Sequence, residues 1–334
     1  MKTVIIGSGS WGSALAQVLA DNHEDVVIWG KDAGEIEEIK TKHTNTKFFP
    51  NVLLNKDIKA TLNITEVRDA DVILLSVPSI AIEDVCQQLV PHLNKKVIIV
   101  NTAKGFHPKN NERMSDVIRH CIPEQYLSSV VSLIGPSHAE EVVQRLLTTI
   151  CAVSLNQEDA KTIQQIFSNH YFRVYRGSDE VGSELGVAVK NAIALASGVL
   201  SGLGYGDNTK AALITRGLAE MIRFGMANGG QLETFMGLTG IGDLIVTCTS
   251  IHSRNFQAGY TIGKANSAEA FWSNNTKTVE GVRTAKVLYE LKNKQKIDMP
   301  IIDEIYKVLY EGKCPSLSAT DLMLRELKAE HTNS

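Results

Sequence analysis

Three glycines near the N-terminus, Gly7, Gly9 and Gly12, constrain the fold more than any other feature of the chain. A β-branched run, Lys2–Ile6, precedes them, and a helical pattern, Ser13–Ala20, follows them. A GxGxxG string alone is often only a turn, but strand, glycine loop and helix in this order are the context of a dinucleotide-binding fingerprint. Gly7 permits the tight turn, Gly9 lets the backbone approach a pyrophosphate, and Gly12 lets the helix pack closely on the strand. The sequence therefore predicts an N-terminal Rossmann domain.

The end of the second predicted strand, Asp25–Trp29, bears on the choice of cofactor. An NAD-specific site usually has Asp or Glu about 20 residues beyond the glycines, where the carboxylate holds the ribose 2′-hydroxyl. Here the strand is followed by Gly30, Lys31 and Asp32. Lys31 favours NADP(H), because its ammonium suits a 2′-phosphate. In the alternative, Lys31 is a solvated loop lysine and Asp32 reaches the ribose.

Strands and helices alternate up to about residue 180, and beyond it the patterns are helical. Further strands are predicted over Ala70–Pro78, Lys96–Asn101, Ser129–Ile134, Cys151–Ser154 and Phe172–Tyr175, with a helix over Glu158–Phe167. Later helices are predicted over Gly182–Gly204, Thr209–Ala227, Ala258–Lys264, Gly281–Asn293, Ile301–Glu311 and Ala319–Lys328. We therefore expect an α/β fold, with a Rossmann domain over residues 1–180 and an all-helical substrate-binding and catalytic domain over residues 181–334. The crevice between two such domains is a natural substrate site.

The predicted helix over Gly182–Gly204 is apolar on nearly every side, yet it contains a lysine, Lys190. A helix of this kind is buried, and a buried ammonium is costly unless a polar or anionic group meets it. Lys190 is therefore a candidate catalytic group. The structural alternatives are a lysine that extends to the surface from a helix flank, or one paired with a carboxylate such as Glu184.

Polar residues elsewhere are candidates for substrate contacts. Lys104 lies three residues beyond a predicted strand end, where open α/β sheets bind ligands. Ser137 follows the Gly135 turn and is a plausible helix cap. Three glycines before Asp243 indicate that the backbone approaches something closely there. The run Ser253-Arg254-Asn255 precedes a predicted helix and suits a phosphate; alternatively it is a capping segment with Arg254 in a salt bridge.

Composition narrows the function class. The chain has 43% hydrophobic and 21% charged residues, as an ordinary soluble enzyme has, and its net charge of −3 gives no reason to expect nucleic acid or a membrane as partner. Its 5 cysteines form no CxxC pair, which predicts reduced thiols in the cytoplasm. The first predicted strand follows Met1 directly, so no signal peptide is predicted. None of the 9 histidines has a partner at metal-ligand spacing, so we expect no metal.

These residues together resemble the bacterial-type NAD(P)-dependent glycerol-3-phosphate dehydrogenases, nearly from end to end. The N-terminal motifs that carry the resemblance are GSGSWGSALA (7–16), LLSVPS (74–79), NTAKGF (101–106) and IGPSHAEEV (134–142). The later ones are VKNAIALASG (189–198), GDNTKAALITRGLAEM (206–221), GLTGIGDLIVTCTS (237–250), SRN (253–255), VEGVRTA (279–285) and MPI (299–301). The glycine fingerprint is shared by many dehydrogenases, whereas the lysine-asparagine helix, GIGDL and SRN are far more specific.

The resemblance implies a role for each matching position. Lys190 is the proton donor and acceptor, and the residues around the substrate with it are Lys104, Gly135, Ser137, Asp243, Thr247, Ser253, Arg254 and Asn255. The residues that line NADPH or NADH are Gly7, Gly9, Ser10, Trp11, Gly12, Lys31, Lys104, Ala139, Arg254, Thr278 and Glu280. Two positions depart from the family pattern: His138 replaces a common aromatic residue, and Lys31 replaces Arg or His. The second departure bears on the strength of the NADP preference.

The resemblance also implies the reaction and the setting. The expected activity is the reversible reduction of dihydroxyacetone phosphate to sn-glycerol 3-phosphate by NAD(P)H, which supplies phospholipid synthesis. The expected assembly is a homodimer, whose helical domain is of the type found at the C-terminus of 6-phosphogluconate dehydrogenase.

Without the resemblance, the residues leave two other functions open. A β-hydroxyacid or ketopantoate-type reductase has the same two-domain architecture, and its carboxylate substrate can use Arg254 equally well. A non-catalytic NADP sensor is the second alternative. Lys190 argues against it, since a sensor needs no proton donor.

Overall fold

The structure is a computed structural model of the 334-residue chain, and it describes residues 1–274, 279–327 and 329–330. Its contacts divide it into two compact units. The first contains Met1–Ala188 and Gly225–Val246, and the second contains Val189–Phe224 and Thr247–Ser334.

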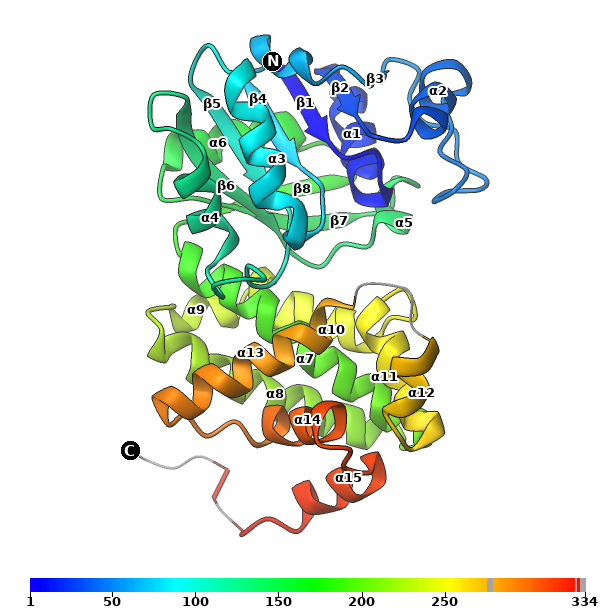
Figure 1. Ribbon diagram of the computed structural model, residues 1–334, viewed down its shortest axis with the longest axis vertical. Helices are drawn as coiled ribbons and strands as arrows, with labels where there is room; N and C mark the ends of the chain where they lie inside the picture. Colours follow the sequence, from blue (N-terminus) through cyan, green and yellow to red (C-terminus); the bar gives the residue numbers. More distant parts are fainter. Residues whose placement is uncertain (275–278, 328, 331–334) are drawn as a thin grey trace. The chain divides into compact units, whose positions relative to one another are not determined.

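An eight-stranded sheet forms the centre of the first unit, with the strand order β3-β2-β1-β4-β5-β6-β7-β8 (Figure 1). The strands are β1 (Lys2–Ile6), β2 (Asp25–Trp29), β3 (Lys59–Thr61), β4 (Val72–Leu75), β5 (Val97–Asn101), β6 (Leu127–Ile134), β7 (Thr148–Val153) and β8 (Phe172–Gly177). Neighbouring strands pair in parallel except β6 and β7. The carboxyl ends of β1, β2, β4, β5 and β6 therefore meet at one edge of the sheet, where α/β folds bind their ligands.

Alternate residues of each strand enter separate cores on the two faces of the sheet, as the two-residue period of a strand requires. In β1, Ile5 packs on one face, and Val4 and Ile6 pack on the other. The first face is covered by α1 (Ser10–Asp21) and α6 (Gln157–Phe167). The second face is covered by α3 (Ile82–Leu89) and α4 (Met114–Cys121). The first unit is thus a doubly wound α/β domain, and the predicted Rossmann fold is confirmed.

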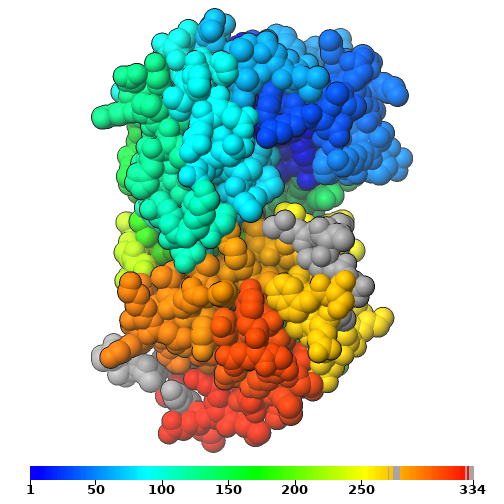
Figure 2. All heavy atoms as spheres, in the orientation of Figure 1, coloured from blue at the N-terminus to red at the C-terminus, as the bar shows by residue number. Residues whose placement is uncertain are grey.

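After β8, the described residues contain helices and no strand. The α-helices are α7 (Glu180–Gly202), α8 (Asp207–Ala227), α9 (Leu232–Phe235), α10 (Asp243–Thr249), α11 (Arg254–Ala265), α12 (Glu269–Asn274), α13 (Glu280–Gln295), α14 (Pro300–Tyr310) and α15 (Pro315–Met323). A π-helix, Leu238–Gly242, precedes α10. In Figure 2, α13 to α15 (orange to red) form much of the visible face of the second unit. The predicted helical C-terminal part is therefore confirmed.

Several predicted boundaries were wrong for identifiable reasons. Helix α1 begins three residues earlier than predicted, directly after Gly9, and α11 begins at Arg254 because Ser253 is its N-cap. Helix α15 begins at a proline, a favoured first helical residue, and ends before the predicted limit. Sequence patterning also missed α2 (Ala33–Lys42), whose N-cap is Asp32, as well as α3, α4 and the short strand β3.

Helix α7 packs against α11 with backbone on backbone, within the second unit. A Cβ atom added to Gly198 of α7 would lie 2.0 Å from the Phe256 carbonyl oxygen, and one added to Gly259 of α11 would lie 1.9 Å from the Leu195 oxygen. Small residues are what permits helices to approach this closely. Helix α7 is long and apolar enough to span a membrane, but 83% of its apolar window is buried inside the structure. It has the character of a core helix.

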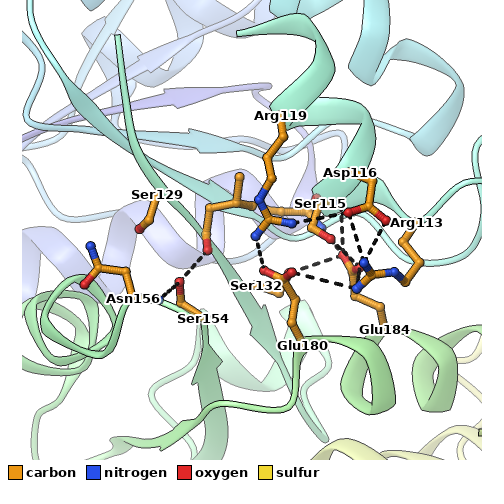
Figure 3. A network of polar contacts seen from close by, with 12 residues as sticks. Arg113, Ser115, Asp116, Arg119, Ser129, Ser132, Ser154, Asn156, Glu180 and Glu184 are labelled. Carbon is orange, nitrogen blue, oxygen red and sulfur yellow. Dashed lines mark hydrogen bonds and ion pairs between the residues drawn. The ribbon is translucent and has the colours of Figure 1, made fainter. Parts of the chain in front are cut away.

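Two buried carboxylates, Glu180 and Glu184, join the first turns of α7 to α4 within the first unit (Figure 3). Glu180 Oε1 lies 2.6 Å from Arg119 Nη2. Glu184 accepts hydrogen bonds from the backbone N–H of Ser115 (3.1 Å) and from the Ser115 hydroxyl (2.7 Å), and its Oε2 lies 3.6 Å from Arg113 Nη1. Such donors offset part of the cost of burying a carboxylate.

Glu184 provides a test of this network. Burial raises the pKa of Glu184 to about 7, although Ser115 and Arg113 act in the opposite direction. An unfolded glutamate titrates near pH ~4.3. Between these values the unfolded chain has released the proton that the folded chain retains, so stability falls as pH rises. We predict that the wild type loses on the order of 3 kcal/mol relative to Glu184→Gln between about pH 4.5 and 7.5.

Thermal unfolding of both proteins across this range measures the effect. Replacement of the exposed Glu158 by Gln is the control, and it should leave the pH profile of the wild type unchanged. A constant difference between the wild type and Glu184→Gln would show that the folded and unfolded chains bind this proton equally.

Candidate active site

The three glycines of the loop have different roles: Gly7 and Gly12 are required by the fold, whereas Gly9 leaves space for a ligand. Gly7 has φ of 119°, and a Cβ atom there would lie 2.4 Å from the Ser76 carbonyl oxygen. A Cβ atom on Gly12 would lie 2.1 Å from the Gly7 oxygen, so both glycines are required by the chain itself. Gly9 has φ of −68°, and nothing lies within 4 Å of a Cβ atom added to it. The space at Gly9 fits a dinucleotide pyrophosphate.

The half-buried residues Ser10 and Trp11 follow Gly9 as the first residues of α1. The first N–H groups of a helix have no partner within the helix, and they favour anions. The loop therefore combines space for a phosphate with donors for it.

At the end of β2, the two candidates for the ribose have different surroundings. Lys31 is exposed. Asp32 is the N-cap of α2, and its Oδ1 accepts hydrogen bonds from the N–H groups of Gly34 (2.9 Å) and Glu35 (3.0 Å). The Asp32 carboxylate is thus already engaged in capping α2.

Beyond β5, the structure places Lys104 beside a carboxylate within the first unit. Lys104 Nζ lies 3.7 Å from Asp243 Oδ2, and the Asp243 side chain is 1% exposed. The turn before Lys104 is held by Asn101, whose Oδ1 accepts from the N–H of Ala103 (3.0 Å). Asn101 Nδ2 in turn lies 3.5 Å from Glu184 Oε1. The carboxylate network of Figure 3 therefore also contacts the residue that shapes the Lys104 loop.

The neighbouring loop, beyond β6, contains Gly135, Ser137 and Ala139. A Cβ atom on Gly135 would lie 2.8 Å from Ile150 Cα of β7, so this loop packs tightly on the sheet. The prediction that Ser137 caps a helix was wrong. His138 is the N-cap of α5 (Ala139–Val142), and the Ser137 hydroxyl donates to the Gly135 carbonyl (3.1 Å) instead.

The glycines before Asp243 approach the chain itself. A Cβ atom on Gly240 would lie 2.1 Å from the Phe235 carbonyl oxygen, whereas Gly242 has only ordinary contacts. The predicted close approach is therefore real at Gly240, where it allows the π-helix to fold back on α9. Asp243 follows as the first residue of α10.

In the second unit, the buried Lys190 meets a hydroxyl group. The residue is 2% exposed, and its Nζ donates to Thr247 Oγ1 of α10 at 2.8 Å. Thr247 is 6% exposed. The predicted polar partner of Lys190 is present, and both residues belong to helices that are fixed by packing.

Next to Lys190, Asn191 organises a polar cluster that sequence reasoning did not single out. Its Oδ1 accepts from Asn255 Nδ2 (3.0 Å), and Asn255 Oδ1 accepts from the N–H of Gly281 (2.9 Å). A Cβ atom on Gly281 would lie 2.5 Å from the Asn191 carbonyl oxygen. The adjacency of Asn191 to Lys190 on a buried helix was the available signal.

The SRN segment begins α11. The Ser253 hydroxyl accepts from the N–H of Phe256 (3.2 Å) as the N-cap. Arg254 follows as the first helical residue and is exposed, and across residues 1–274, 279–327 and 329–330 it has no ion-pair partner. The alternative interpretation, a capping segment with Arg254 in a salt bridge, is therefore met by Ser253 but not by Arg254 within the described residues. Glu280 begins α13, and Thr278 lies outside the described residues.

The doubly wound sheet, the glycine loop and the helical second half define an NAD(P)-dependent oxidoreductase. Two family profiles match the chain: the N-terminus of NAD-dependent glycerol-3-phosphate dehydrogenase over residues 2–160, and its C-terminus over residues 179–319. The chain therefore belongs to the NAD(P)-dependent glycerol-3-phosphate dehydrogenase family.

Individual relatives agree with this assignment. The chain is 47% identical to the glycerol-3-phosphate dehydrogenase (NAD(P)+) of Enterococcus faecalis over 331 residues, which cover 99% of this chain and 97% of the relative. The corresponding enzyme of Streptococcus agalactiae is 46% identical over 99% of this chain and 98% of its own. The crystal structure of glycerol-3-phosphate dehydrogenase from Coxiella burnetii has a TM-score of 0.88 and 32% identity, over 97% of this chain and 99% of that one.

The family predicted from the motifs is thereby confirmed, as are the fold class and the oxidoreductase activity. The two alternatives, a ketopantoate-type reductase and an NADP sensor, are excluded because the matched family is that of the glycerol-3-phosphate dehydrogenases. The roles of individual residues remain predictions.

The glycine loop yields a matched pair of variants. Gly12→Ala should lower stability by about 1–3 kcal/mol, because the new methyl group overlaps the Gly7 carbonyl. Gly9→Ala should leave the melting temperature unchanged and weaken NADPH binding about tenfold or more, because its methyl group occupies the space for the pyrophosphate. Thermal unfolding and fluorescence titration with NADPH separate the two effects. Unchanged NADPH affinity in Gly9→Ala would mean that the cofactor does not approach Gly9.

Proposed function

We propose that the chain catalyses the reversible reduction of dihydroxyacetone phosphate to sn-glycerol 3-phosphate with NAD(P)H. The observation that carries the proposal is the buried Lys190 ammonium of α7, held by the Thr247 hydroxyl at 2.8 Å within the helical unit. Reduction of a ketone requires a proton donor at the carbonyl oxygen. NADPH oxidation with dihydroxyacetone phosphate, beside hydroxypyruvate and ketopantoate, tests the proposal, and only the first should support turnover.

Lys190 donates the proton that the developing alkoxide needs. The nicotinamide, when bound, supplies the hydride to C2 of the substrate. Thr247 fixes the direction of the Lys190 ammonium, and Lys104, 3.7 Å from Asp243, polarises the carbonyl. Asp243 and Thr247 lie four residues apart in α10, and residues at this spacing share one face of a helix.

The phosphate of the substrate binds at the start of α11. Arg254 offers a fork of N–H donors, and the N-terminus of the helix adds backbone N–H groups. Asn255 is oriented by Asn191 and by the N–H of Gly281, so its position is fixed before the substrate arrives. The further substrate contacts are proposed at Gly135, Ser137 and Ser253.

The cofactor lies along the glycine loop, with Ser10, Trp11, Lys31, Ala139 and Glu280 around it. Lys104, Arg254 and Thr278 complete the proposed set. NADP(H) is the preferred form, since Lys31 is exposed while the Asp32 carboxylate caps α2. The proposed division falls near residue 180: residues 1–180 provide most of the cofactor contacts, and residues 181–334 provide Lys190 and most of the substrate contacts.

Assembly and setting rest on the resemblance to the family. We infer a homodimer in the cytoplasm that supplies glycerol phosphate for phospholipid synthesis. Exposed apolar side chains near the end of the helical unit, among them Leu317 (58%), Met323 (81%) and Leu324 (78%), are consistent with a partner surface.

Lys190→Ala should lower kcat at least ~100-fold, the usual scale for loss of a general acid. NADPH affinity should stay the same, because the glycine loop is untouched. Steady-state kinetics with dihydroxyacetone phosphate measure the first effect, and fluorescence titration measures the second. Replacement of the exposed Lys286 by Ala is the control for loss of a lysine in the same unit. A mutant within a few-fold of wild-type kcat would remove Lys190 as the proton donor.

Arg254→Lys should weaken catalysis as well as substrate affinity. Lysine keeps the charge but loses the planar fork that engages two phosphate oxygens, and binding of a remote phosphate also serves the reacting carbon. Inorganic phosphite added to the truncated substrate glycolaldehyde separates these roles. It should activate the wild type strongly and Arg254→Lys much less, while Arg68→Lys, at an exposed site in the first unit, behaves as wild type. Equal activation of all three proteins would place the phosphate site elsewhere.

A further inference from the structure

A carboxylate in α2, that of Glu35, joins the glycine loop to a lysine that no motif identified. Glu35 Oε2 accepts from the Ser8 hydroxyl at 2.6 Å, and Glu35 Oε1 lies 2.5 Å from Lys47 Nζ. Ser8 lies between Gly7 and Gly9, and its side chain adjoins the residue after β2: a Cβ atom on Gly30 would lie 2.6 Å from Ser8 Oγ. These contacts lead from the end of β2 to Lys47 within the first unit.

The segment that carries Lys47 is fixed at two points. Asn45, which is fully buried, donates to the Ser8 carbonyl oxygen at 2.8 Å and to the Ser13 hydroxyl at 2.9 Å. Glu38 of α2 accepts from the Thr44 hydroxyl (2.8 Å) and the Thr46 N–H (2.9 Å). The segment therefore stays beside the glycine loop, and its lysine has a defined position.

The location is where a Rossmann domain meets the adenosine ribose, just beyond β2 and next to the glycine loop. Lys47 is 61% exposed, and its ammonium has three N–H donors, of which Glu35 accepts one. Both oxygens of Glu35 already have donors, in Ser8 and Lys47. Asp32 is engaged as a helix cap. The surroundings thus offer cationic donors rather than an unengaged carboxylate.

We propose that Lys47 is a second specificity-determining residue for NADP(H), which contacts the 2′-phosphate together with Lys31 while Glu35 and Ser8 hold it in place. The proposal rests on the proposed cofactor site at the glycine loop. Lysine is a compact, mobile charge without a fork, so two lysines together supply the several donors that one arginine would offer. The replacement of the usual Arg or His by Lys31 is offset in this way.

Binding of two cofactor fragments tests the proposal without any turnover. Isothermal titration with 2′-phospho-ADP-ribose and with ADP-ribose compares the same molecule with and without the 2′-phosphate. Lys47→Ala should weaken binding of the first about tenfold, because one charge-assisted contact is lost, and should leave binding of the second unchanged. Lys40→Ala, which removes an exposed lysine from the neighbouring helix α2, should change the binding of neither fragment.

A second variant examines Glu35 itself. Glu35→Gln keeps an amide oxygen that can still accept from Lys47 and removes a negative charge next to the phosphate, so it should keep or strengthen binding of 2′-phospho-ADP-ribose. A loss of ADP-ribose affinity in this variant would mean that Glu35 holds the ribose hydroxyls, and it would overturn the proposal. Equal losses for both fragments in Lys47→Ala, or no loss for either, would overturn it as well. If the wild type binds neither fragment, the proposed cofactor site itself fails.

Discussion

The backbone contact between α7 and α11 is the constraint on which the polar groups of the helical unit depend. Glycines at Gly198 and Gly259 let the two helices approach until backbone meets backbone. This approach brings Asn191 of α7 within hydrogen-bond distance of Asn255 of α11. A methyl group at either glycine would overlap a carbonyl oxygen of the other helix and separate these amides. Packing of the smallest residues therefore fixes the position of the Asn255 amide, next to Arg254 in the first turn of α11.

Helix α7 also contains a buried charge, the Lys190 ammonium. Transfer of an ammonium from water to an apolar interior costs several kcal/mol unless hydrogen bonds replace its hydration. Lys190 has the Thr247 hydroxyl as one replacement. Because the ammonium lies in apolar surroundings, an anionic substrate or a developing alkoxide would stabilise it further, as the proposed role of Lys190 requires. Apolar packing around Lys190 and its proposed role as proton donor are thus linked.

Much of the fold followed from local patterns, because buried strands and amphipathic helices are specified by nearby residues. The limits of β1 and β2 and the start of the helical half belong to this class. The missed or misplaced elements depended on capping: Asp32 is the N-cap of α2 and Ser253 is the N-cap of α11, and the helical pattern alone shows neither. The lysine at residue 190 was visible as a charge in an apolar run. Asn191 had only its adjacency to Lys190 as a signal and Lys47 had none, because their partners lie 64 and 12 residues away along the chain.

Helix capping also bears on cofactor choice. In a typical NAD site, the acid after the second strand accepts hydrogen bonds from the ribose. Here Asp32 instead accepts from two N–H groups of α2, and loss of such a cap costs about 1 kcal/mol. A ribose hydroxyl would have to compete with these bonds for the Asp32 carboxylate. The next acid along α2, Glu35, is neutralised by Lys47 and occupied by Ser8. With both carboxylates engaged in the fold, the proposed contact of Lys31 and Lys47 with a 2′-phosphate meets no unengaged acid at Asp32 or Glu35.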